Sequence, residues 1–349
     1  MLIKSLTVEN FRNFNSFVID FDKSLNVISG LNGSGKTSLL EAVYYLSRGK
    51  SFRSQCVVNI VNHNQDELML KASLVSDDID IAVGISKNKS GKKVIRFNGK
   101  DEKTFKSLTS SLPLLLLDTD THRQVASGSK HRRSIIDWGC FYHYPDFSKI
   151  WRDYNKTLAQ RNYALKSGCD VIVWNDLLVE KAESLNYYRK MYCEDLSCVF
   201  KYFWKKFAEN LDEIECDFFC GWNTEIGLLN ELVESTNLDL KLGYTRFGPH
   251  RMDLKFNVKD NSAFQVLSQG QQKIMSYALT LAQGKLLRDK KDISCIYLID
   301  DLPAELDSFR IKAVLDELIK IDSQVILTAI NYEIVSQALS LNFKSIILD

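Results

Sequence analysis

Gly30-Leu31-Asn32-Gly33-Ser34-Gly35-Lys36-Thr37-Ser38 is the stretch that decides the fold. It fits the pattern G-x-x-x-x-G-K-[ST], follows a short apolar segment at residues 25–28 and precedes apolar residues at helical spacing in 39–46. Strand, glycine-rich loop and helix in this order are typical of a phosphate-binding loop, because the backbone N–H groups can turn toward the phosphates. A chance turn before a helix is the alternative. We expect residues 30–38 to bind a nucleotide, with Lys36 on the β and γ phosphates and Thr37 on magnesium.

A second strand ends in acidic residues. Residues 295–299 form an aliphatic run that leads into Asp300-Asp301. A carboxylate at the end of a neighbouring parallel strand can hold Mg²⁺ beside the loop. We therefore assign Asp300 to the metal, directly or through water, and Asp301 to orienting or deprotonating the attacking water; with Lys36 they form the predicted catalytic set. The alternative is an acidic pair that merely ends a core strand.

The order of two further motifs restricts the choice among possible folds. Ser268-Gln269-Gly270-Gln271 precedes a predicted helix, with Ser268 placed to cap it and Gly270 leaving the backbone open to an anion. A capped helix start is the simpler explanation, but the motif lies before the aspartate strand, as the signature motif of ABC-type ATPases does. Residues 302–307 then stand where such ATPases carry the D-loop. The predicted fold is α/β: an ABC-type P-loop ATPase head with a mixed sheet, plus a helical second lobe inserted between the Walker A and signature motifs.

The pattern along the chain predicts two domains. Residues 2–21 alternate like a hairpin, residues 68–97 like antiparallel strands, and residues 130–210 carry apolar side chains at helical spacing. We predict that residues 1–112 and 244–349 form the head and that residues 113–243 form a helical arm.

Composition excludes several classes of protein. Of the 349 residues, 45% are hydrophobic and 26% are charged, which excludes a disordered or collagen-like chain. The 45 basic and 44 acidic groups give a net charge of +1, so any anion binding must be local. The eight cysteines include no C-x-x-C pair, which disfavours structural zinc. The start of the chain contains no apolar core of a signal peptide, and the longest aliphatic run, near residues 112–117, is far too short to span a membrane. We expect a cytoplasmic protein with no membrane partner.

The chain resembles the RecF family of bacterial DNA replication and repair ATPases, which is related to the SMC and Rad50 group. The resemblance runs from residue 2 to the C-terminus. The segments that carry it are residues 9–14 (ENFRNF), 30–38, 48–53 (RGKSFR), 132–133 with 137–139 (RR and DWG), 160–162 (QRN), 248–251 (GPHR), 268–271 and 298–307. Several of these are particular to the RecF family rather than common to ABC-type ATPases.

The resemblance implies an ATP- and Mg²⁺-dependent switch. ATP would lie between the heads of a homodimer, enclosed by the loop of one subunit and by Ser268, Gly270 and Gln271 of the other. Arg12 and Asn13 match a position that touches the nucleotide in related heads, although a solvated hairpin turn remains the alternative. The implied partners are single- and double-stranded DNA and RecR, with RecO and RecA in the same pathway.

The resemblance also suggests where DNA binds. The candidate DNA contacts are Lys50, Arg53, Lys130, Arg132 and Arg133, and the arm carries further basic residues, among them Arg152, Lys156, Arg161, Lys201, Lys205 and Lys206. For each of these a solvated charged face is the alternative. His250, within the GPHR segment, keeps an open role.

Two departures from the family pattern concern hydrolysis. Residues 113–117 carry no Gln to sense magnesium and the γ-phosphate, and Thr328 stands where many ABC ATPases carry a His. A hydroxyl is a weaker electrostatic partner than an imidazole, so slow hydrolysis is expected.

The alternative functions are the ATPase head of a transporter or of another SMC-like complex, and a P-loop kinase of a small metabolite.

Overall fold

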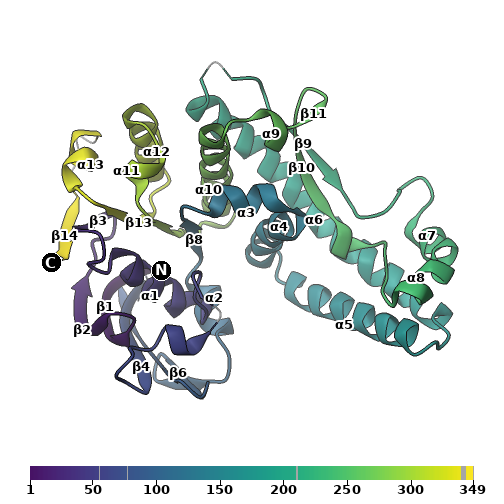
Figure 1. The fold of residues 1–349 in the computed structure, drawn as a ribbon, viewed down its shortest axis with the longest axis horizontal. Helices are drawn as coiled ribbons and strands as arrows, with labels where there is room; N and C mark the ends of the chain where they lie inside the picture. Colours follow the sequence, from purple (N-terminus) through teal and green to yellow (C-terminus); the bar gives the residue numbers. More distant parts are fainter. Residues whose placement is uncertain (55, 77, 210, 339–342, 349) are drawn as a thin grey trace. The chain divides into compact units, whose positions relative to one another are not determined.

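A computed structural model describes residues 1–54, 56–76, 78–209, 211–338 and 343–348 (Figure 1). The chain divides into two compact units, Met1–Thr121 with Ser276–Asp349 and His122–Met275. These limits differ from the predicted boundaries at 112/113 and 243/244. The strand at Leu114–Leu117 pairs within the parallel sheet of the first unit, and the strand at Asp253–Val258 pairs with one in the second. Strand pairing, which sequence composition does not reveal, therefore sets the division.

The first unit contains a five-stranded parallel sheet in the order β14-β3-β13-β12-β8. Its strands are β3 (Leu25–Gly30), β8 (Leu114–Leu117), β12 (Ile296–Ile299), β13 (Gln324–Ala329) and β14 (Lys344–Leu348). Every residue of β12 and β13 is buried, as expected for parallel strands covered on both faces. The phosphate loop leaves β3, and β12 ends at the aspartate pair, so the predicted strands are confirmed and lie in one sheet.

A six-stranded antiparallel sheet in the same unit has the order β2-β1-β4-β5-β6-β7. Its strands are β1 (Leu2–Phe11), β2 (Phe14–Asp20), β4 (Glu67–Ser76), β5 (Ile79–Asn88), β6 (Lys93–Phe97) and β7 (Lys100–Glu102). The predicted hairpin is confirmed, because Phe11 pairs with Phe14 across a two-residue turn made by Arg12 and Asn13. The parallel and antiparallel pairings predicted for the head thus belong to separate sheets.

Helix α1 (Lys36–Arg48) is buried on almost all sides. One apolar cluster joins Leu39, Leu40 and Val43 of this helix to residues of both sheets, such as Leu70 and Leu298. Burial of so much apolar surface fixes the helix, and with it the loop that precedes it. The other short helices of this unit are η1 (Val57–Asn59), α2 (Lys106–Ser111), α11 (Leu302–Glu305), α12 (Ser308–Lys320) and α13 (Tyr332–Ala338).

The second unit is mainly helical, as predicted for the arm. It contains α3 (Thr121–Ser127), α4 (Ser129–His143), α5 (Phe147–Lys166), α6 (Ile172–Phe207), α7 (Leu228–Glu234), α8 (Thr236–Leu242), η2 (Pro249–Arg251) and α9 (Ala263–Val266). A small antiparallel sheet joins β9 (Glu215–Phe219), β10 (Asp253–Val258) and β11 (Asn261–Ser262). Helix α10 (Gln269–Lys291) begins in this unit and ends in the first. In the described ranges, no helix combines the length and the apolar character needed to cross a bilayer.

Candidate nucleotide-binding site

The phosphate loop needs its glycines for backbone geometry and for space. Gly33 and Gly35 have φ values of 89° and 106°, a region that favours glycine. A Cβ on Gly35 would stand 2.7 Å from the Phe14 ring and 2.8 Å from Asn13 Nδ2. The loop therefore runs directly against the hairpin turn, and the structure brings Asn13 to it.

Lys36 is buried and turned back over the loop. Its Nζ donates hydrogen bonds to the carbonyl oxygens of Gly30 at 2.7 Å and Leu31 at 2.9 Å. Ser34 Oγ is buried and has no hydrogen-bond partner among the described residues. An ammonium group and an unsatisfied hydroxyl at a glycine-rich helix start are donors suited to phosphate oxygens.

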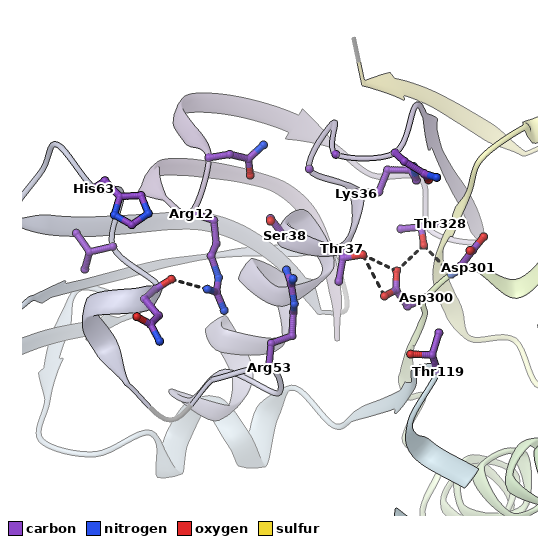
Figure 2. Close-up of a pocket in the computed structure, with 16 residues that line it drawn as sticks. Arg12, Lys36, Thr37, Ser38, Arg53, His63, Thr119, Asp300, Asp301 and Thr328 are labelled. Atoms are coloured by element: carbon purple, nitrogen blue, oxygen red, sulfur yellow. Dashed lines mark hydrogen bonds between the residues drawn. The ribbon is translucent and has the colours of Figure 1, made fainter. Parts of the chain in front are cut away.

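Thr37 and Asp300 are in direct contact, although they are 263 residues apart in the sequence. Thr37 Oγ1 donates at 3.1 Å to both carboxylate oxygens of Asp300 (Figure 2). Burial raises the pKa of Asp300, and hydrogen bonds from Thr328 and Thr37 oppose that rise. The parallel alignment of β3 and β12 with β13 between them creates this meeting of a hydroxyl and a carboxylate.

Thr328 links the two aspartates. Its Oγ1 donates to Asp300 Oδ1 at 2.7 Å and accepts the backbone N–H of Asp301 at 2.8 Å. Asp301 adopts a left-handed conformation with φ 52°, and burial, followed by the nearby Asp300 charge, raises its pKa. From the sequence, Thr328 was expected only as a weak substitute for a histidine; its hydroxyl instead holds the aspartate pair in place.

Glu41 is a site residue that sequence reasoning missed. Its side chain is fully buried and binds Arg12 through two hydrogen bonds, Nε at 2.8 Å and Nη2 at 2.6 Å. Ser51 Oγ also donates to Glu41, Arg53 Nη1 lies 3.8 Å from it, and Arg12 also donates to the Asn59 carbonyl. A sequence signal existed: Glu41 is an acidic residue within the apolar run at residues 39–43.

Arg12, Lys36, Thr37 and the aspartate pair line one cavity of about 630 Å³ in the first unit, and the buried Glu41 lies behind Arg12 (Figure 2). Its lining residues are Arg12, Asn13, Asn32, Gly33, Gly35, Lys36, Thr37, Ser38, Arg53, Asn59, Val61, His63, Thr119, Asp300, Asp301 and Thr328. Most of these were predicted as site or DNA-contact residues. Asn59, Val61, His63 and Thr119 were not, because they come from segments with no motif. Thr119 reaches the cavity because it follows β8, which pairs with β12.

The donor set fits a nucleotide with a hard cation. Mg²⁺ prefers oxygen ligands and keeps waters and substrate phosphates in its shell. The Thr37 hydroxyl and the Asp300 carboxylate supply two such oxygens. Among the described residues there is no cluster of three or more His, Cys, Asp or Glu side chains suited to a metal, so a cation here would need phosphate and water oxygens as well.

The predicted signature residues lie in the second unit, at the start of α10. The N–H of Ser268 donates to Gln271 Oε1 at 2.8 Å, and the N–H of Gln271 donates to Ser268 Oγ at 3.3 Å. This reciprocal pair is a capping box. It leaves Ser268 and Gly270 exposed at the helix N-terminus, where the helix dipole favours an anion.

Several predicted DNA contacts of the second unit are used within the fold. Arg132 is buried and pairs with Asp253, with both distances 2.8 Å. Arg133 donates to the Met252 carbonyl at 2.6 Å, and burial lowers its pKa. Arg161 is fully buried, with Asp239 at 3.0 Å. Because each of these guanidinium groups is engaged in contacts within its own unit, none is proposed as a DNA contact.

Three further candidate DNA contacts are exposed, and His250 is structural. Lys130, Lys50 and Arg53 are exposed. His250 is a structural residue of the second unit: Tyr154 Oη lies 2.7 Å from its Nδ1, and its Nε2 lies 2.9 Å from the Thr245 carbonyl. Burial lowers the pKa of His250 to about 4, so the ring is neutral at pH 7 and bridges two segments.

Comparison with known proteins gives consistent results. The profile of the RecF/RecN/SMC N-terminal domain family matches residues 2–346. A DNA replication and repair protein RecF from Francisella tularensis subsp. mediasiatica is 37% identical over 331 residues, which cover 94% of each chain. The structure of the recombination mediator protein RecF with ATP, in the RecFOR pathway, aligns with TM-score 0.83 and 26% identity over 95% of this chain and 92% of that one. An Smc head bound to the C-terminal winged-helix domain of ScpA shares the fold alone, with TM-score 0.61 and 16% identity over 97% of this chain and 92% of that one.

Proposed function

The chain belongs to the RecF family, and on that premise we propose that it is an ATPase that acts as a switch in recombinational DNA repair and replication restart. It binds ATP with Mg²⁺, dimerises on DNA at single-strand gaps and at junctions of double- and single-stranded DNA, and assists RecA loading with RecO and RecR. The similarity to a RecF of the RecFOR pathway supports the pathway and the partners.

The contact between Thr37 and Asp300 carries the proposal. A hydroxyl from the loop and a carboxylate from the end of β12, 3.1 Å apart, are the two protein ligands that a Mg²⁺ on the β and γ phosphates needs. When bound, ATP would supply the phosphoanhydride bond, and Mg²⁺ would offset part of the phosphate charge. Lys36 Nζ now donates hydrogen bonds to two loop carbonyl oxygens. With ATP bound, it would donate hydrogen bonds to the phosphate oxygens instead.

Asp301 is the proposed base. Its raised pKa moves the carboxylate toward the range in which it can accept a proton from water. The Thr328 hydroxyl fixes the Asp301 backbone and is committed to Asp300. This commitment, together with the absence of Gln from residues 113–117, supports slow hydrolysis suited to a switch.

The position of the signature residues supports dimerisation. In one subunit the phosphate loop belongs to the first unit, and the exposed Ser268 and Gly270 belong to the second. The start of α10 is a helix N-terminus, which favours an anion, and the phosphate loop belongs to the other unit. We propose that it meets the γ-phosphate held by another subunit, so that ATP joins the two.

The test is binding of a fluorescent gapped duplex at fixed salt with ATP, ADP or no nucleotide, with protein mass measured in parallel. We expect a DNA-bound dimer with ATP only. Lys36→Ala should abolish the ATP-dependent dimer, whereas Lys312→Ala, an exposed lysine of α12, should behave as wild type.

If the Lys36→Ala variant still forms the ATP-dependent dimer, Lys36 does not have the proposed role of binding the ATP phosphates. A wild-type chain that stays monomeric and binds no DNA under every nucleotide condition would refute the repair function. The transporter and kinase alternatives would then be tested next.

A further inference from the structure

The antiparallel sheet of the first unit carries a local excess of positive charge. Residues 87–106 contain eight basic and two acidic side chains, an excess of six in a chain whose net charge is +1. The basic members are Lys87, Lys89, Lys92, Lys93, Arg96, Lys100, Lys103 and Lys106. This segment contains β6, which is labelled in Figure 1, and β7, which is the edge strand of the sheet.

Two of these lysines oppose each other directly. Lys87 of β5 pairs in register with Lys93 of β6, so both side chains project from the same face. Lys87 Nζ lies 5.8 Å from the centre of the Tyr45 ring, and Lys93 Nζ lies 5.4 Å from that of Phe105. Like charges directly across two strands are destabilising. Burial lowers the pKa of Lys87, and the charge of Lys93 lowers it further.

Three further lysines are close in sequence either to Phe105 or to Gly49, which contacts Phe105. Gly49, at the end of α1, is in such close contact with Phe105 that any Cβ on it would collide with the ring, and Lys50 comes next. Lys106 follows Phe105 and begins α2, and Lys103 precedes it by two residues. We call the set around the Tyr45 and Phe105 rings the basic patch; its members are Lys50, Lys87, Lys93, Lys103 and Lys106.

The charges of the basic patch are uncompensated. Within the part of the chain that the structure describes, none of its five ammonium groups takes part in an ion pair. The two acidic residues of the segment are used elsewhere: Asp101 pairs with Arg96 at 2.9 Å, and Glu102 accepts a hydrogen bond from Ser107 at 2.8 Å. Lys50, Lys93, Lys103 and Lys106 are exposed. Repulsion among them would be relieved by a polyanion.

The aromatic rings of the patch indicate which polyanion. Single-stranded nucleic acid is held by exposed aromatic side chains that stack on its bases. Here Tyr45 is fully buried, Phe105 is half-buried, and lysines lie over both rings. The patch therefore offers ammonium groups without a stacking surface, which is the chemistry for the phosphates of a duplex.

We propose that the basic patch binds the phosphate backbone of duplex DNA. This inference rests on the proposed function and adds a surface to it that no motif indicated, apart from Lys50. The patch is distinct from the nucleotide cavity: α1 begins at Lys36 and ends at Arg48, beside the patch, and its 13 residues span about 20 Å. One rigid, buried helix thus joins the phosphate loop to the duplex.

The test compares two triple variants with equal charge change. Lys93, Lys103 and Lys106 are replaced by Gln in the patch variant, and the exposed Lys23, Lys241 and Lys312 by Gln in the control. Binding of a labelled duplex of about 30 base pairs is measured with ATP over a range of salt concentrations. Each lost phosphate contact lowers the slope of log K against log salt by about 0.9, so we expect a slope smaller by about 2 to 3 and, near 0.1 M salt, binding weaker by about tenfold or more.

The control variant should keep the wild-type slope, and a Lys→Arg version of the patch variant should restore it. Melting temperatures of all variants show that they fold. If the folded patch variant keeps the wild-type affinity and slope, the basic patch does not bind duplex DNA, and the proposed function is unaffected. A wild-type chain that binds no DNA would overturn both.

Two further binding measurements distinguish duplex DNA from other polyanions that the patch could bind. A larger loss on a single strand of equal length than on the duplex would refute the duplex assignment. A loss seen only with vesicles of anionic lipid, and not with DNA, would show that the patch binds a membrane surface and would refute the proposal.

Discussion

The bond between Arg12 and Glu41 can be tested by a double-mutant cycle. Glu41 is fully buried and Arg12 is 17% exposed at its side chain, and two hydrogen bonds of 2.6 and 2.8 Å join them. Replacing Glu41 with Gln keeps the volume but leaves the Arg12 guanidinium facing an amide at the wall of the cavity. Replacing Arg12 with Ala leaves a buried carboxylate with only Ser51 and the more distant Arg53.

The magnitude follows from this burial. Exposed ion pairs contribute about 0 to 1 kcal/mol, and removal of one partner from a fully buried pair costs about 3 to 5 kcal/mol. A pair with one fully and one largely buried member lies between these limits. We expect each single variant to lose about 2 to 3 kcal/mol and the coupling energy to be about 1.5 to 2.5 kcal/mol, so the double variant should be little worse than either single one.

The assay must report on the first unit alone. All five tryptophans, at positions 138, 151, 174, 204 and 222, lie in the second unit, so their fluorescence monitors that unit. Native-state hydrogen exchange of the α1 amides gives the free energy of opening of the first unit. ATP affinity is measured on the same four proteins, and Lys312→Gln serves as a surface control. Additivity of the two single variants within about 0.5 kcal/mol would refute the view that Glu41 positions Arg12.

Three other predictions follow from the site and the arm. Asp301→Asn should keep ATP-bound dimers on DNA for longer, because it removes the proposed base; an unchanged hydrolysis rate, measured by phosphate release, would exclude that role. Thr328→Val removes a hydrogen bond that lowers the pKa of Asp300, so the acidic limb of the pH–rate profile should move to higher pH, whereas Thr328→Ser should keep it in place. An unmoved limb in the valine variant would contradict this coupling. His250 has a folded-state pKa of about 4, below its unfolded value of 6.5, so the unfolded chain binds more protons between these values. Stability of the second unit should therefore be complete above pH 6.5 and fall by up to about 3 kcal/mol as the pH drops toward 4. Tryptophan-monitored unfolding checks this, and His250→Asn should show a shallower dependence on pH; equal slopes would refute the role of the ring.

The sequence by itself determined the elements and the chemistry of the loop. Glycine spacing, Lys36 and Thr37 are local properties of one strand–loop–helix segment, and the buried strands of the parallel sheet are continuous apolar runs. The hairpin at Arg12 and the helical arm also follow from periodicity, because the side-chain repeat depends only on local backbone geometry.

Only the tertiary structure decided which distant groups meet. Strand order placed Asp300 against Thr37 and Thr328. Strand pairing also explains why the two units divide at residues 121/122 and 275/276 rather than at the predicted 112/113 and 243/244. The same holds for charged residues. Arg132 and Lys93 look alike in sequence, yet one is buried against Asp253 while the other lies uncompensated above a ring. Whether a charge is paired or available depends on packing between segments far apart in the chain, and that information is not contained in any local pattern.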